Sequence, residues 1–246
     1  LKRIFGYFCR LFCEYTKHTM AKKQKQEDEV LIDVTQSISS VEKFFEENGK
    51  ALSAFAIALF AIVGGYVAFL KFYQEPRELE AQNEIYHAQQ LFEADSLKQA
   101  VEGFAGHAGF LSVAADYSGT KAGEMANYYA GISYLRLGEY DNAIRLLDDF
   151  STKDPILSVI AKGSIGDAFL ELNQSEEALE YYTKASTVNS NDFVVPFYLL
   201  KAGMLAENLS NNKEAIKFYE RIKSEFPDAR QAVDIDRYIA RVKAKI

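Results

Sequence analysis

One uninterrupted apolar segment divides this chain. Residues 51–70 (ALSAFAIALFAIVGGYVAFL) contain no charged side chain, and Lys50 and Lys71 close the segment at its two ends. As an α-helix it would be about 30 Å long, which matches the hydrocarbon core of a bilayer. A helix of this length in a soluble core would normally show a polar stripe. We therefore expect a single N-terminal transmembrane helix over 51–70, with membrane lipid around it.

The segment before the span is short and holds both cysteines of the chain, Cys9 and Cys13. We expect residues 20–50 to form a cytoplasmic tail, because Met20 opens a Met-Ala-Lys-Lys sequence that is typical of a bacterial start. Residues 1–19 would then come from an upstream start choice. The alternative is that they form a basic amphipathic helix on the membrane surface. A further amphipathic helix is expected inside the tail, with an apolar face made of Val34, Ile38, Val41 and Phe45.

The basic residues around the span indicate its orientation. Lys43 and Lys50 precede it and Lys71 and Arg77 follow it, so the counts beside the membrane are equal. Three further lysines within residues 22–25 favour the tail as the cytoplasmic side. We expect the C-terminal domain to lie on the opposite side of the membrane.

The domain after the span is acidic. Residues 72–246 carry 18 Lys and Arg against 27 Asp and Glu, which gives a net charge of −9. Such a surface repels nucleic acid and anionic lipid, and no basic patch with interleaved aromatic residues occurs in this sequence. We therefore expect no nucleic-acid partner.

An internal repeat runs through the same domain. Its unit is a glycine followed twelve residues later by an alanine, and successive units start 35 and 37 residues apart. Small residues on two helices let those helices pack at close range, while aromatic side chains fill the space between neighbouring pairs. The three units are Gly131–Ala143, Gly166–Ala178 and Gly203–Ala215, and an earlier degenerate copy contains Ala88, Leu91, Ala100 and Phe104.

Glycine and proline positions predict where the helices of each repeat end. Gly138 is expected to close the first helix of its repeat as a C-cap, and Asn173 and Ser210 stand in its place in the next two repeats. Pro155 and Pro227 are expected to stop second helices.

These residues resemble the tetratricopeptide repeat, whose period is 34 residues. The resemblance covers about residues 81–227, and a closing helix over 229–245 would cap the stack. It implies an all-α fold in which a tetratricopeptide α-solenoid domain, residues 76–246, follows the anchor. A generic antiparallel helical array is the alternative. The residue types at 116–120 are typical of a turn and predict an insertion between the first two copies.

Few residues have the spacing that catalysis or metal binding requires. His18, His87 and His107 lack partners at metal or triad spacing, and the sequence has no phosphate loop, nucleophile elbow or CxxC. The acidic pairs at 148–149 and 176–177 are expected to be solvated helix surface. We therefore expect no catalytic residues, no metal and no cofactor. The alternative is an enzyme or lipid-binding module inside the solenoid.

The repeat implies that the domain binds another protein. In tetratricopeptide repeats the first helix of each pair lines a concave groove. The mixed apolar and acidic lining expected here suits an extended or helical polypeptide. It lacks the Lys, Asn and Arg set with which some repeat proteins clamp a C-terminal carboxylate. Carried over position by position, the groove residues are Tyr128, Ile132, Leu135, Arg136, Asp167, Leu170, Glu171, Phe197, Leu200, Met204, Glu207 and Asn208.

The anchor has a pattern of its own. Small residues follow 3-4-3-4-3 spacing, which places them on one face of the helix and allows another helix to approach closely in lipid. We expect this transmembrane docking face to consist of Ala51, Ala54, Ala58, Ala61, Gly65 and Ala68.

The short tail, the single anchor and the repeat domain together resemble the YfgM-like family of bacterial inner-membrane proteins. The motif GTKAGEMANYYAGISYLRLGEYDNAI at residues 119–144 carries most of that resemblance. It implies a single-pass protein of the bacterial inner membrane, with the N-terminus cytoplasmic and the domain periplasmic. It also implies association with the SecYEG translocon and a PpiD-like chaperone, and help for translocating polypeptides. The alternative is a tetratricopeptide scaffold for another cell-envelope assembly or secretion machine.

Overall fold

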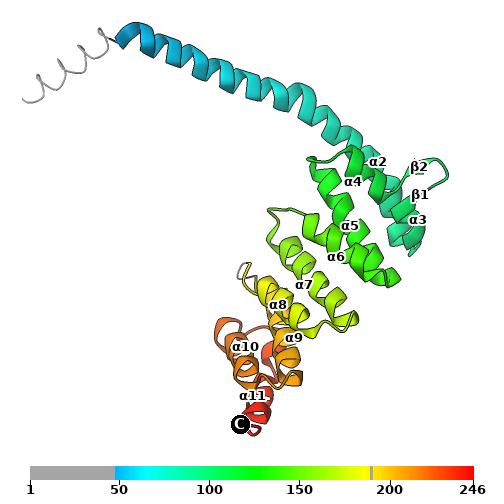
Figure 1. The fold of residues 1–246 in the computed structure, drawn as a ribbon, viewed down its shortest axis with the longest axis vertical. Coiled ribbons are helices and arrows are strands. Elements are labelled where there is room, and N and C mark those ends of the chain that lie inside the picture. Colours follow the sequence, from blue (N-terminus) through cyan, green and yellow to red (C-terminus); the bar gives the residue numbers. More distant parts are fainter. Residues whose placement is uncertain (1–47, 189–190) are drawn as a thin grey trace, which may run out of the picture. The chain divides into compact units, whose positions relative to one another are not determined.

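The computed structural model describes residues 48–188 and 191–246 (Figure 1). The predictions for residues 1–19 and for the amphipathic tail helix fall outside the described residues. The chain divides into two units between Phe69 and Leu70.

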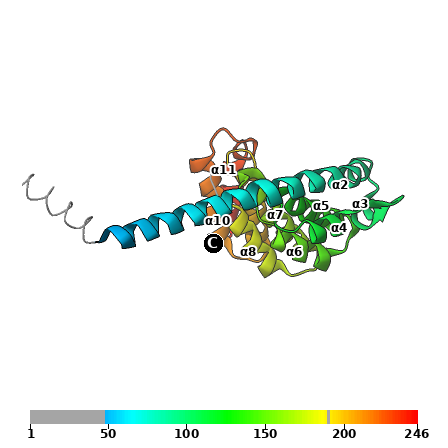
Figure 2. The same cartoon turned by 90° about the horizontal axis from the view of Figure 1, so that it is seen from above.

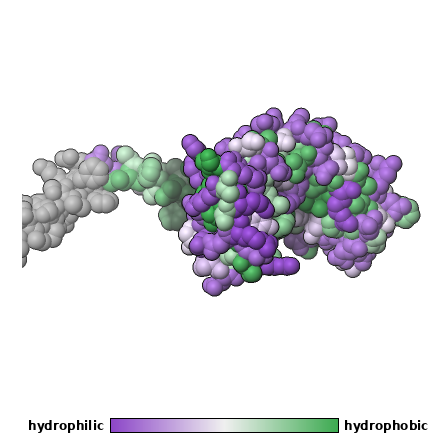
Figure 3. All heavy atoms as spheres, turned by 90° about the horizontal axis from the view of Figure 1, so that it is seen from below, coloured by the Kyte–Doolittle hydropathy of each residue, from purple (hydrophilic) through white to green (hydrophobic). Residues whose placement is uncertain are grey.

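In the first unit, residues 48–69 are α-helical. They belong to the helix Asn48–Glu93, and its apolar stretch makes this the one described helix that is long and apolar enough to cross a membrane. None of that stretch is buried within the protein, and Figure 3 colours it largely as hydrophobic. An added Cβ at Gly65 would meet no other atom within 4 Å, so the docking face is uncovered in this chain and stays a prediction.

The second unit begins with a π-helical turn, Leu70–Gln74, and continues as α2, Glu75–Glu93. Its remaining elements succeed one another along the solenoid, coloured from green to red in Figure 1. They are α3 (Leu97–Glu102), β1 (Gly103–Phe104), β2 (His107–Ala108), α4 (Phe110–Asp116), α5 (Lys121–Leu137), α6 (Tyr140–Asp149), α7 (Pro155–Glu171), α8 (Ser175–Ala185), α9 (Val195–Asn208), α10 (Asn212–Glu225), a 3₁₀ turn (Arg230–Ala232) and α11 (Ile235–Lys243).

The helices pair as the repeat predicts. Helices α5 and α6, α7 and α8, and α9 and α10 form the most closely packed pairs, and each pair also packs on the next. In Figure 2 the second helices α6 and α8 lie along one edge of the domain. The all-α solenoid expected from the sequence is therefore confirmed.

The repeat glycines lie where their helix partners come closest. A Cβ added at Gly166 would fall 2.7 Å from the ring of Tyr182, and one at Gly203 would fall 2.4 Å from the ring of Tyr219. At Gly131 the nearest atom would be Cγ of Leu147, at 2.6 Å. Real Cβ atoms do not approach so closely, so these positions require glycine for packing, as predicted.

The turns inside the helix pairs share one backbone conformation. Gly138 has φ 81°, and Asn173 and Ser210 both have φ 60°. Asp95, between α2 and α3, has φ 59°. The predicted C-cap at Gly138 is confirmed, and the residues that replace it adopt the left-handed conformation without a glycine.

Pro155 corrects one prediction, because it does not stop a second helix. Helix α6 ends at Asp149, and Pro155 begins α7. Asp154 precedes it as the N-cap, and its carboxylate accepts hydrogen bonds from the amides of Ile156 (2.8 Å) and Leu157 (2.9 Å). Proline has no amide hydrogen to satisfy, so the first helical position suits it.

The degenerate first copy departs from the predicted pattern at Phe104. This residue lies in β1 of a short antiparallel hairpin and is 54 % exposed, so it does not pack between helices. The hairpin and α4 fill the longer spacing that the sequence indicated, and the predicted turn follows α4. His107 of the hairpin stacks on His87 of α2, with ring centroids 3.7 Å apart.

The closing segment is shorter and more broken than the predicted helix over 229–245. A 3₁₀ turn precedes α11, whose apolar side chains Ile235, Ile239 and Val242 are buried against the last helix pair. The other face of α11 is charged, so it covers the end of the apolar core.

Candidate functional site

A pocket of about 500 Å³ lies where the C-terminal parts of α5, α7 and α9 come together. Seven of the predicted groove residues line it: Leu135, Arg136, Asp167, Leu170, Glu171, Met204 and Asn208. The sequence analysis did not name the other lining residues, which are Tyr140, Tyr182, Lys201 and Leu205. Parallel first helices of successive repeats bring positions 35 to 37 residues apart onto this one surface.

Part of the pocket wall is apolar and open to solvent. Leu170 is 40 % exposed and Met204 is 45 % exposed, and Leu135 lies beside them half-buried. Exposed apolar side chains grouped in a hollow are typical of sites that bind another molecule.

Asp167 and Lys201 form the polar centre of the pocket. The carboxylate of Asp167 accepts a hydrogen bond from the Tyr182 hydroxyl (2.5 Å) and pairs with Nζ of Lys201 (2.6 Å). The ammonium group of Lys201 also lies 5.0 Å from the ring centroid of Phe197. Burial, and next the hydrogen bond to Asp167, raise the pKa of Tyr182, so its hydroxyl remains a neutral donor.

Arg136 is the second cation of the pocket, and its charge is also compensated. Its Nη2 lies 2.7 Å from Oδ1 of Asp95, and its guanidinium lies 5.6 Å from the ring centroid of Phe92. The two partners come from α2 and the turn that follows it. Residues of the first, degenerate repeat thus hold Arg136 at the rim of the pocket.

Glu171 is different from the other charged residues of the pocket. Its carboxylate accepts one long hydrogen bond, 3.4 Å, from the hydroxyl of Tyr140. Within residues 48–188 and 191–246, no Lys or Arg lies within ion-pair distance of it. Glu171 is exposed at the end of α7.

Four other predicted groove residues do not line the pocket. Tyr128 and Ile132 pack on a small buried cluster around Ile165, and Leu200 packs on the larger core of the last repeats. Phe197 is 43 % exposed, and its ring lies beside Lys201, which lines the pocket. Their part in binding stays a prediction.

Glu207 also lies outside the pocket lining, and it is paired with residues of the closing segment. Its carboxylate accepts two hydrogen bonds from Arg241 (2.9 and 2.6 Å) and one from Lys245 (2.6 Å). Only 8 % of its side chain is exposed. Hydrogen bonds from Arg241, and then from Lys245, lower the pKa of this carboxyl to about 2. Glu207 therefore ties α9 to α11 at the end of the solenoid.

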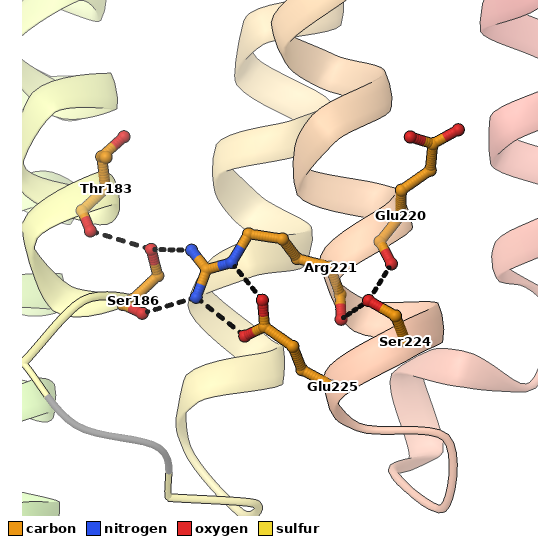
Figure 4. Close-up of polar contacts among 6 residues, drawn as sticks. All are labelled: Thr183, Ser186, Glu220, Arg221, Ser224 and Glu225. Carbon is orange, nitrogen blue, oxygen red and sulfur yellow. Dashed lines mark hydrogen bonds and ion pairs between the residues drawn. The ribbon is translucent and has the colours of Figure 1, made fainter.

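A second polar contact joins α8 and α10 (Figure 4). Arg221 of α10 donates to the carbonyl of Ser186 (3.3 Å) and to its hydroxyl (3.4 Å) at the end of α8. The same guanidinium holds Glu225 through two hydrogen bonds of 2.9 and 3.0 Å, which lowers the pKa of Glu225. These hydrogen bonds thus join the second helices of adjacent repeats.

At the other end of the first helices, a hollow of about 680 Å³ lies at the N-termini of α5 and α7. Its helix amides are already satisfied. Glu78 accepts from the amides of Lys121 (2.6 Å) and Ala122 (3.2 Å), and Asp154 caps α7. Few free backbone amides therefore remain at this end to bind an added anion.

In the part of the chain that the structure describes, no group of three or more His, Cys, Asp or Glu side chains is arranged to hold a metal ion. The stacked pair of His87 and His107 presents ring faces to one another rather than converging nitrogens.

Comparison with known proteins agrees with the repeat. Residues 128–192 and 164–230 match the family model for the tetratricopeptide repeat. No curated protein matches the chain. Among solved structures, a Podosopora anserina protein of the kinesin light chain type with nearly identical TPR-like repeats is similar at 12 % identity. That match covers 68 % of this chain and 86 % of the other, with a TM-score of 0.49. The matched residues lie on helices α5 to α10.

Proposed function

We propose that this repeat-containing chain is a membrane-anchored scaffold that binds a polypeptide in the pocket between α5, α7 and α9. The observation that carries the proposal is the gathering of seven predicted groove residues around one hollow. Tetratricopeptide repeats are in general scaffolds for protein partners, and the exposed Leu170 and Met204 supply apolar contact area.

A polypeptide suits this pocket better than a small molecule does. The hollow combines apolar side chains of α5, α7 and α9 with the carboxylates of α7 and the side-chain amide of Asn208. Such a surface supports main-chain and side-chain contacts spread over several residues of a partner.

The finer proposal concerns the partners. The apolar anchor, the tail before it and the domain after it support a single-pass protein of the bacterial inner membrane, with the domain in the periplasm. The resemblance to the YfgM-like family supports association with the SecYEG translocon and a PpiD-like chaperone. There the pocket would receive translocating polypeptides as they leave the channel.

Co-purification of the full chain from native membranes in mild detergent tests the pocket. We expect a double variant, Leu170→Asn with Met204→Asn, to recover less partner protein than the unmodified chain, because exposed apolar contact area is lost. The matched control, Ile156→Asn with Val233→Asn, changes two apolar side chains of 39 % and 82 % exposure outside the pocket. Equal recovery by the two variants would contradict the proposal.

The same preparation tests the finer proposal. Recovery of partners without SecY or the chaperone would exclude the translocon and favour another envelope assembly. We also propose that the small-residue face of the anchor docks on a partner helix in lipid. Leucine at Ala58 or Gly65 should then weaken recovery while the repeat domain keeps its circular dichroism, and unchanged recovery would remove that docking face.

A further inference from the structure

We infer that the pocket selects polypeptide segments that carry one lysine or arginine among apolar side chains, and that Glu171 receives the cation. This inference rests on the proposed function and names the class of ligand for the same site. It follows from the distribution of charge around the pocket.

Both cations of the pocket are occupied by partners inside the protein. Lys201 pairs with Asp167 at 2.6 Å, and Arg136 pairs with Asp95 at 2.7 Å. A ligand carboxylate would have to displace one of these pairs before it gained a contact. The pocket is therefore poorly suited to acidic segments.

Glu171 is the charged lining residue whose partner is missing among the described residues. The one hydrogen bond that it accepts from a described residue, the Tyr140 hydroxyl, is 3.4 Å long and leaves most of the carboxylate open to a donor. Because the side chain is exposed, an incoming ammonium or guanidinium group reaches it without costly desolvation.

The helix geometry adds negative potential at the same place. Helix α5 ends at Leu137, α7 ends at Glu171 and α9 ends at Asn208, so three C-terminal turns meet at the pocket. Each C-terminus carries a partial negative charge of roughly half an electron. The net charge of −9 over residues 72–246 attracts cationic segments at longer range.

The requirement for apolar side chains in the ligand follows from the neighbours of Glu171. Leu170 precedes it directly, and Met204 faces the same hollow from α9. A ligand that places its basic residue at Glu171 therefore brings adjacent side chains onto these two apolar surfaces. A basic segment without apolar side chains would gain only the ion pair with Glu171.

Fluorescence anisotropy with the full chain in phosphatidylcholine nanodiscs tests the selection. The probes are labelled peptides rich in Leu and Met that differ at one position, which is Lys, norleucine or Glu. We expect the Lys peptide to bind about fivefold more tightly than the norleucine peptide, as for an exposed ion pair, and the Glu peptide to bind most weakly. The preference should shrink as salt is added.

Glu171→Gln should remove the preference for Lys while the norleucine peptide binds as before. Glu84→Gln, an equal charge change on an exposed residue of α2 outside the pocket, should leave the preference intact. A preference for Lys that survives in Glu171→Gln, or equal binding of all three peptides by the unmodified chain, would overturn the inference.

The double variant Leu170→Asn with Met204→Asn separates this inference from the proposed function. If the double variant weakens the binding of all three peptides, and the unmodified chain binds the three equally well, the polypeptide pocket stands and the selection for a basic residue fails. If no peptide binds the unmodified chain, or the double variant binds every peptide as well as the unmodified chain, both proposals fail.

Discussion

Replacing Glu207 by Gln should destabilise the end of the solenoid in a way that depends on pH. The change removes the negative charge that accepts hydrogen bonds from Arg241 and Lys245 but keeps the size of the side chain. Because Arg241 and Lys245 flank the end of α11, the effect should appear first where α11 covers the core.

The pKa of Glu207 gives the magnitude. Its fall from 4.5 to about 2 corresponds to an upper value of about 3 kcal/mol at neutral pH. Arg241 and Lys245 are each 49 % exposed, so water and salt screen them, and about 1–2 kcal/mol is the realistic loss. For a domain of this size that loss lowers the melting temperature by roughly 3–6 °C.

Thermal unfolding of the full chain in detergent, followed by far-ultraviolet circular dichroism from pH 7 to pH 2, measures the effect. The folded carboxyl has a lowered pKa, so its stabilisation is complete above pH 4.5 and is lost as the pH falls through about 2. The gap between wild type and Glu207→Gln should therefore close over that window. A gap that is constant with pH would refute the reasoning, and Glu84→Gln should show almost no gap.

Three further changes follow from packing and caps. Gly203→Ala should cost about 1–3 kcal/mol in unfolding free energy, because the new Cβ would fall 2.4 Å from the ring of Tyr219; an unchanged melting temperature would contradict this close contact. Asp154→Ala should cost about 1 kcal/mol through loss of the α7 N-cap, and Asp154→Ser should restore most of it. Ser210→Gly should gain up to about 1 kcal/mol, because Ser210 has φ 60°; a lower melting temperature in that variant would show that its side chain matters more than its backbone.

The repeat was predictable because its signal is local and recurs. Gly166 and Gly203 repeat at a nearly constant spacing, and the alanines that pack opposite them repeat with them. Asn173 and Ser210 could be placed in the turn from their alignment with Gly138, although neither residue type by itself requires a positive φ. Pro155 was misplaced because a proline marks either side of a helix boundary, and only the cap at Asp154 decides which.

The pocket was predictable in outline and its electrostatics were not. The alignment placed Asp167 and Glu171 on one surface, but no local pattern indicates that Lys201, 34 residues from Asp167, would neutralise one of them and leave the other. The pairing of Glu207 has the same origin, because its partner Arg241 lies 34 residues away in the closing helix. The stacking of His87 and His107 depends on a hairpin that no pattern in the sequence predicted.

Photo-crosslinking tests the central claim most directly. A crosslinking amino acid is placed at Met204 in the pocket or at Val233, which is exposed outside it, in the full chain within native membranes. We predict polypeptide adducts from position 204 and few from position 233, with adducts at 204 reduced by Leu170→Asn. Equal adducts from the two positions, or none from 204 while 233 reacts, would contradict a polypeptide-binding pocket.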